Sequence, residues 1–217
     1  MKSQQSGFTL VEIAIVLVII GLLLGGILKG QELINSAKVK NLANDFRVIP
    51  TYIYAYQDKF RAVPGDDKVA SAHVNGATDP PAASAGNGVI NGLWNSSTAT
   101  DESFLFWQHV RLAQLAAGPT VTTDATYLPT NAVGGRIGVS SLTTGQPQAL
   151  GLTGTYQICS AGIQGKFAKQ LDVTMDDGNV TTGSMRAVPD GSAPGFTAVD
   201  ITTDTQLSSP YTVCLSF

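Results

Sequence analysis

The sequence predicts an α+β fold in which a long N-terminal helix packs on a globular head containing an antiparallel sheet. Three observations lead to this prediction: an apolar run near the N-terminus, an apolar stripe at helical spacing behind it, and short strand-like segments in a Gly- and Thr-rich remainder. Only 13% of the 217 residues are charged, whereas roughly a quarter is usual in soluble domains. This length suffices for one domain with a core plus an appendage.

The apolar run covers residues 8–28, and Glu12 is its single charged residue. As a helix, its 21 residues would be about 31 Å long, which matches a bilayer core of roughly 30 Å. A secretory signal peptide would instead have about 7–15 apolar residues before a small-residue cleavage site. The run therefore predicts a membrane-spanning helix. The cationic residues that follow do not fix its orientation.

The segment SGFTLVE at the start of this run resembles the processing motif of type IV prepilins, with Gly7, Phe8 and Glu12 at its key positions. In that family a membrane peptidase cleaves after the glycine and methylates the new amine. The resemblance implies that residues 1–7 are a cytoplasmic leader and that Phe8 becomes the methylated N-terminus. It also implies that Glu12 neutralises this amine on a neighbouring subunit, since either charge alone is costly in apolar surroundings. From the residues alone, Glu12 could instead lie near the membrane interface and snorkel.

The helical pattern continues beyond the membrane segment and predicts one helix from Phe8 to about Arg61, with residues 29–61 as an amphipathic stem. Pro50 predicts a kink within it. Gly21 and Gly25 have the spacing that lets membrane helices approach closely, although glycine is also tolerated in such helices without this role. The stripe recurs at steps of three and four residues: Val39, Leu42, Phe46, Ile49, Ile53, Tyr56 and Phe60.

Residues 62–217 are expected to form the head, with helices over Asp101–Ala117 and Ile163–Leu171. The resemblance implies the pilin fold, and the Pro-Gly-Asp turn at Pro64–Asp67 is similar to that of larger pilin-like proteins. The strand candidates are Arg136–Ser140, Tyr156–Ser160, Ser184–Val188, Thr197–Ile201 and Thr212–Ser216.

The two cysteines, Cys159 and Cys214, lie 55 positions apart and suit either one disulfide or two inert thiols. Compartment decides between these, and a head outside the cytoplasmic membrane favours oxidation. Pilins often link their C-terminal region in this way, so the resemblance implies a disulfide.

An acidic cluster is formed by Asp172, Asp176 and Asp177. Pseudopilins of the major type bind calcium near the C-terminus, and by this resemblance the three aspartates are calcium candidates. The Asp-Asp-Gly-Asn order lacks the alternating acids of an EF-hand loop. We favour a tight turn, with Gly178 or Asn179 at positive φ, and expect no cofactor.

Enzyme activity finds no support in the sequence. His73 and His109 have no partners at metal-ligand spacing, and no Gly-x-Ser-x-Gly motif occurs. We expect no catalytic residue and no resident metal. No basic stripe indicates nucleic acid as an obligate partner, and the net charge is −3.

The resemblance implies a structural subunit, a pilin or pseudopilin, of a type IV pilus or a type II secretion pseudopilus. The size favours a minor or specialised subunit. Expected partners are the prepilin peptidase, other subunits, an inner-membrane assembly platform and, before assembly, the lipid bilayer. The expected location is the bacterial inner membrane with the head outside, then the filament. The alternative is a membrane-tethered binding protein that never polymerises.

Overall fold

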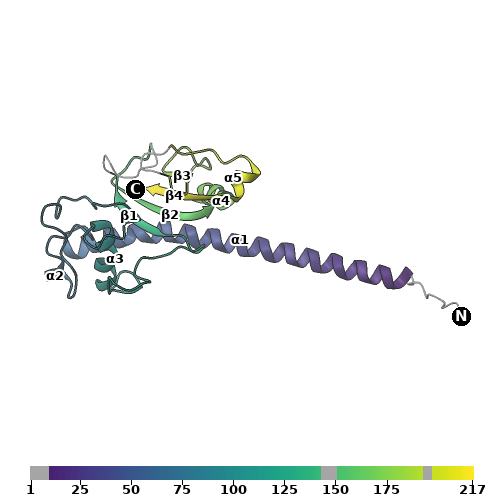
Figure 1. Ribbon diagram of the computed structural model, residues 1–217, viewed down its shortest axis with the longest axis horizontal. Coiled ribbons are helices and arrows are strands. Elements are labelled where there is room, and N and C mark those ends of the chain that lie inside the picture. Colours follow the sequence, from purple (N-terminus) through teal and green to yellow (C-terminus); the bar gives the residue numbers. More distant parts are fainter. Residues whose placement is uncertain (1–9, 143–150, 193–196) are drawn as a thin grey trace. The chain divides into compact units, whose positions relative to one another are not determined.

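The computed structural model describes residues 10–142, 151–192 and 197–217 (Figure 1). The chain divides into two compact units, one ending at Lys38 and the other comprising Val39–Phe217. A long N-terminal helix and a four-stranded antiparallel sheet confirm the predicted α+β class.

The first helix, α1 (Leu10–Phe60), belongs to both units. From Val39 onward its apolar stripe is buried as predicted, except that Phe60 is half-buried. The helix continues through Pro50, and the predicted kink stays a prediction. Arg61 follows with a φ of 57°, the left-handed conformation that commonly ends a helix, here without a glycine.

The sheet has the strand order β1-β2-β4-β3, and every neighbouring pair is antiparallel. Its strands are β1 (Ile137–Ser141), β2 (Tyr156–Gln164), β3 (Met185–Pro189) and β4 (Pro210–Ser216). All four overlap predicted strands. The prediction of a fifth strand at Thr197–Ile201 is wrong, because the structure assigns no strand to these described residues. The Val199 amide donates one backbone hydrogen bond to the Ala187 carbonyl of β3 (3.2 Å), but the segment does not pair with β3 as a strand.

The head helices differ from prediction mainly at their ends. α3 (Glu102–Leu112) stops five residues before the predicted Ala117, because Gln114 adopts a left-handed φ of 64° that ends the helix before Gly118. α4 (Gly165–Met175) begins later than predicted, since Ile163 belongs to β2. Two short helices were not predicted, α2 (Ala70–His73) and α5 (Asp204–Ser208).

The main core contains side chains from α1, α3, α4 and the sheet. Phe46 of α1 and Phe106 of α3 are almost fully buried, as are Val139 of β1, Ile158 of β2 and Val213 of β4. The alternation of the strands sends these side chains to one face of the sheet, and the stripe of α1 supplies the apolar surface they need.

Candidate functional site

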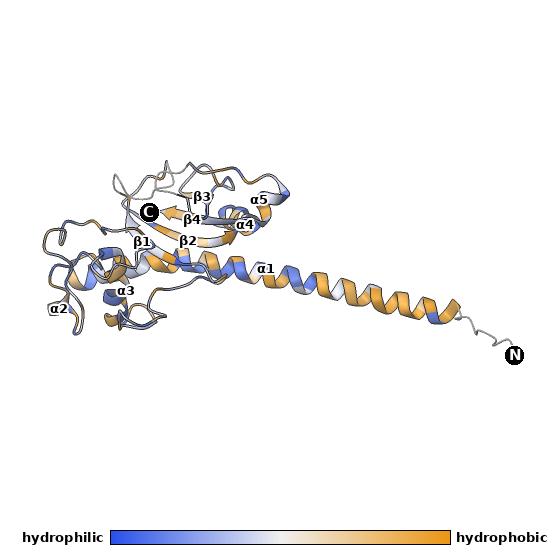
Figure 2. Cartoon of the chain, viewed as in Figure 1, coloured by the Kyte–Doolittle hydropathy of each residue, from blue (hydrophilic) through white to orange (hydrophobic). Residues whose placement is uncertain are grey.

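The N-terminal half of α1 presents apolar side chains to its surroundings (Figure 2). Within the described residues, α1 is the one helix long and apolar enough to cross a membrane, and its most apolar window is not buried by the chain. Burying one such side chain is worth about 1.5–3 kcal/mol, so this segment favours a membrane or other helices over water. The exposed large apolar residues up to residue 28 are Leu10, Val11, Ile13, Ile15, Val16, Leu17, Val18, Ile19, Ile20, Leu22, Leu23, Leu24, Ile27 and Leu28.

Glu12 lies in the first turn of α1 and is exposed. A carboxylate in this turn interacts favourably with the positive end of the helix dipole. Gly7 and Phe8, the predicted cleavage site, lie outside the described residues.

Glycines interrupt the apolar surface without breaking the helix. α1 runs unbroken through Gly21, Gly25, Gly26 and Gly30, and a Cβ built at any of them would meet nothing within 4 Å. The spacing of Gly21 and Gly25, with no other atoms of the chain near them, is one that lets another helix approach closely.

The two cysteines form a disulfide that joins the central strands of the sheet. Cys159 of β2 and Cys214 of β4 are register partners, with their Cα atoms 4.1 Å apart. Both are buried beside Trp94. The covalent link therefore reinforces the pairing of two strands that are far apart in the sequence.

Buried polar groups help to hold the turn after α1. The Asp66 carboxylate accepts hydrogen bonds from the backbone amides of Gly86 (2.6 Å), Asn87 (3.2 Å) and Gly88 (2.7 Å). Because a buried carboxylate with several amide donors is well stabilised, Asp66 fixes the loop around Gly86 against the end of the stem.

The neighbouring Asp67 is also buried and binds side chains from two helices. Its Oδ2 accepts the Tyr56 hydroxyl of α1 at 2.8 Å and lies 2.7 Å from Nδ1 of His73 in α2. His73 therefore has a structural partner and does not belong to a metal-ligand set in the described residues.

His109 of α3 is fully buried and has both ring nitrogens bonded. Its Nδ1 accepts from the Gly65 amide at 3.0 Å, so its Nε2 carries the hydrogen and donates to the Thr78 carbonyl at 2.8 Å. Burial lowers the pKa of His109, although the Thr78 carbonyl opposes this effect. The neutral imidazole thus links α3 to the backbone at Gly65 and at Thr78 through two hydrogen bonds, and neither of its nitrogens is left for catalysis.

Sequence analysis did not identify Asp66 and Asp67 as buried anchors. The available signal was a pair of acids in a Pro-Gly turn, which is typical of an exposed turn as well. The amides that donate to Asp66 lie 20 or more residues further along the chain, so local spacing could not reveal these contacts.

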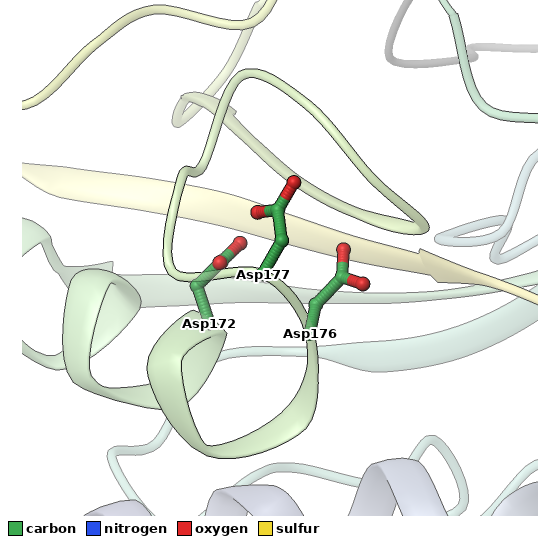
Figure 3. Close-up of side chains that lie close together, drawn as sticks. All are labelled: Asp172, Asp176 and Asp177. Atoms are coloured by element: carbon green, nitrogen blue, oxygen red, sulfur yellow. The ribbon is translucent and has the colours of Figure 1, made fainter.

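The acidic cluster at the end of α4 is brought together as the sequence suggested (Figure 3). One carboxylate oxygen from each of Asp172, Asp176 and Asp177 lies within 4.8 Å of the others. The expected turn is also present, since Gly178 has a φ of 84°. The structure thus contains the expected turn and brings the three carboxylates close together, and calcium binding stays a prediction.

The three aspartates differ in their surroundings. Asp177 is exposed and accepts from the Thr182 hydroxyl (2.6 Å), and Asp176 accepts from the Met185 amide (2.8 Å). Asp172 is fully buried, and neither of its carboxylate oxygens has a hydrogen-bond partner. Burial raises the pKa of Asp172 to about 6; the amides of Gly178 and Asn179 partly oppose this, but neither is within hydrogen-bonding geometry.

Comparison with known proteins gives one match. A family model described as the prokaryotic N-terminal methylation motif matches residues 2–28, which include Gly7, Phe8 and Glu12. No curated protein and no solved structure matches the chain. The matched segment is the apolar start of the chain, and the head has no counterpart among these matches. The chain therefore carries the N-terminal methylation motif that is the hallmark of type IV pilin and pseudopilin precursors.

Proposed function

We propose that the chain is a structural subunit of a type IV pilus or a type II secretion pseudopilus. The observation that carries this proposal is the methylation motif at the start of the chain. It is followed by the apolar half of α1, whose side chains are not buried by the rest of the chain. Such a segment avoids water both in a bilayer and when packed among copies of itself. A subunit can therefore pass from membrane storage to a filament without exposing this surface to water.

In this scheme the prepilin peptidase removes residues 1–7 and methylates Phe8. Residues 8–28 span the inner membrane and then form the filament core, residues 29–61 form the stem, and residues 62–217 form an extracytoplasmic head. An inner-membrane platform adds subunits in a head-to-tail manner, and such heterologous contacts produce an open-ended fibre.

Glu12 is the proposed partner of the methylated amine of a neighbouring subunit. The opposite charges offset the cost of placing each one among apolar side chains. No clustered catalytic site emerges from the described residues, and the buried His109, Asp66 and Asp67 bind backbone and side-chain groups of the head. We therefore propose a structural role and no enzyme activity.

The first test is mass spectrometry of the N-terminus of protein recovered from its own host's membranes. An N-methylated chain that begins at Phe8, and that is lost when the host's prepilin peptidase is deleted, is the expected result. A chain that still begins at Met1 would overturn the proposed function and leave a tethered extracytoplasmic domain.

A second test separates processing from assembly. Glu12→Gln should leave cleavage intact and sharply reduce the filaments sheared from cells, because the neutral amide no longer compensates the amine. Glu32→Gln is the matched control: Glu32 is also exposed on α1, where it pairs with Lys29 at 2.6 Å, and filament yield should not change. Deletion of the chain then distinguishes the systems, by loss of surface filaments or by retention of secreted proteins in the cell.

A further inference from the structure

We propose that the side chain of Asn179 is an acceptor for N-linked glycosylation, with a lipid-diphosphate-linked oligosaccharide as the donor. Asn179, Val180 and Thr181 form an Asn-x-Thr tripeptide whose middle residue is not proline. On a surface loop of a secreted protein, such a tripeptide is the acceptor of N-linked glycans. The exposure of the asparagine and the hydrogen bonds of its side chain support this assignment.

Asn179 lies in the loop between α4 and β3. This loop comprises residues 176–184, and Figure 3 shows its beginning at Asp176 and Asp177. Asn179 is exposed, whereas Val180 beside it is 2% exposed and belongs to the main core. The Val180 carbonyl also accepts from the Ala187 amide of β3 (3.0 Å). The middle residue therefore anchors the tripeptide to the head, and a glycan on Asn179 would extend into solvent without displacing core side chains.

The side-chain amide of Asn179 is oriented by Thr181. The Asn179 Oδ1 accepts from the Thr181 hydroxyl (2.7 Å) and from the Thr181 backbone amide (3.1 Å). Because a backbone amide can only donate, the oxygen of the side chain must face it. In the part of the chain that the structure describes, the Asn179 Nδ2 donates no hydrogen bond. The turn thus occupies the oxygen and leaves available the nitrogen that would carry the sugar.

The Thr181 hydroxyl also assists the chemistry of transfer. An amide nitrogen is a weak nucleophile, because its lone pair is delocalised into the carbonyl group. Transfer forms a bond between Nδ2 and C1 of the first sugar, while the bond from C1 to the lipid diphosphate breaks and its electron pair leaves on the diphosphate oxygen. One Nδ2 proton passes to a base of the transferase. A hydrogen bond donated to Oδ1 stabilises the negative charge that develops on the amide, so this proton is easier to remove.

A second tripeptide of the same type, Asn-x-Ser, begins at Asn95 and provides a comparison within the chain. Asn95 is also exposed, but among the described residues Ser97 does not bind its side chain. Two positions before Asn179 lies Asp177, an exposed carboxylate that a cationic group of the transferase can bind, whereas the corresponding residue before Asn95 is the apolar Leu93. We therefore expect Asn179 to be modified and Asn95 to remain unmodified.

The test is mass spectrometry of the full-length chain recovered from its own host's membranes. Trypsin should release a peptide of residues 170–186, which contains Asn179 and no other asparagine. Electron-transfer fragmentation should place a sugar mass on Asn179, and the peptide that contains Asn95 should carry none. An unmodified 170–186 peptide would overturn the proposal. A sugar found only on a serine or threonine, or only on Asn95, would overturn it as well.

Four variants make the test specific. Asn179→Gln should abolish the added mass, and Asn95→Gln is the matched control that should keep it. Thr181→Val removes the hydroxyl at nearly constant shape and should also abolish the modification, whereas Thr181→Ser should retain it. Retention by the serine variant would show that the hydroxyl is required rather than the threonine methyl group. Full modification of Thr181→Val would overturn the assignment to this type of acceptor.

Modification of Asn179 requires a head outside the cytoplasm, and in this respect it rests on the proposed function. It requires neither cleavage after Gly7 nor filament assembly. The N-terminal peptide of the same sample reports on processing. A chain that begins at methylated Phe8 but carries no sugar would overturn the glycosylation alone, whereas a glycosylated chain that begins at Met1 would overturn the proposed function alone.

Discussion

Loss of the disulfide between Cys159 and Cys214 should destabilise the head more than most single substitutions would. The bond closes a loop of 55 residues, and the loop-entropy relation gives about 4 kcal/mol for a loop of this length. For a domain of 150–250 residues, this corresponds to a fall in melting temperature of about 8–16 °C. The effect arises in the unfolded chain, which gains freedom when the link is absent.

The assay is urea unfolding of the full-length chain in detergent, followed by tryptophan fluorescence. Trp94 lies in the same buried cluster as the two cysteines, so its emission reports on this region. The wild type is compared with and without a reductant, and both are compared with Cys159→Ala/Cys214→Ala. Reduction retains the two sulfur atoms, whereas the double substitution removes them, so the difference between the two separates cross-linking from packing.

We expect reduction to lower the free energy of unfolding of the wild type by about 4 kcal/mol and to leave that of the double variant unchanged. A loss below about 1 kcal/mol on reduction would refute the loop-entropy reasoning. It would indicate that residual structure in the unfolded chain already holds β2 and β4 close together.

Two further predictions concern the turn after α1. Gly65→Ala should lower the free energy of unfolding in urea by at least about 2 kcal/mol, because φ is 91° and a Cβ would overlap the Glu102 carbonyl oxygen. Gly134 is the control: it has a similar φ of 87°, but a Cβ there would meet no atom within 4 Å, so Gly134→Ala should lower the free energy by only about 1 kcal/mol. Equal costs would exclude the overlap as the cause. The contribution of His109 to stability should also fall as pH drops below about 6.5, by up to about 1.4 kcal/mol per unit, because the folded state holds His109 neutral while the unfolded state protonates. Asp172, whose pKa burial raises to about 6, contributes a slope of the opposite sign below that pH, so the His109 slope is measured as the difference between the wild type and a His109 variant. His109→Gln should flatten that slope between pH 5 and 6.5, and an unchanged slope would assign it to another group.

Periodic elements of the fold were predictable from the sequence because their signals are local. The stripe from Val39 to Tyr56 recurs at helical spacing, and the structure buries it. Strand segments were located, but their ends were not: β2 continues to Gln164 through an irregular register after Ser160. The segment at Thr197–Ile201 has strand-like composition, yet pairing requires a partner with free backbone groups along its whole length.

Helix ends were less predictable because tertiary contacts override local signals. α3 stops at Leu112 although Gly118 and Pro119 were the evident stop signals, and Gln114 adopts the left-handed conformation in their place. The capping box of α5, formed by Thr203 and Gln206, was a local signal that could have been found.

The sequence by itself determined the membrane-type helix, the methylation motif and the presence of a single pair of cysteines, because each depends on residues that are neighbours or on simple counting. Only the tertiary structure decided which polar side chains are buried. His109 meets Gly65 across 44 positions and Asp66 meets Gly88 across 22, so no local pattern encodes these contacts. Asp172 shows the difference most clearly: the sequence places it near two other acids, but only packing removes it from water.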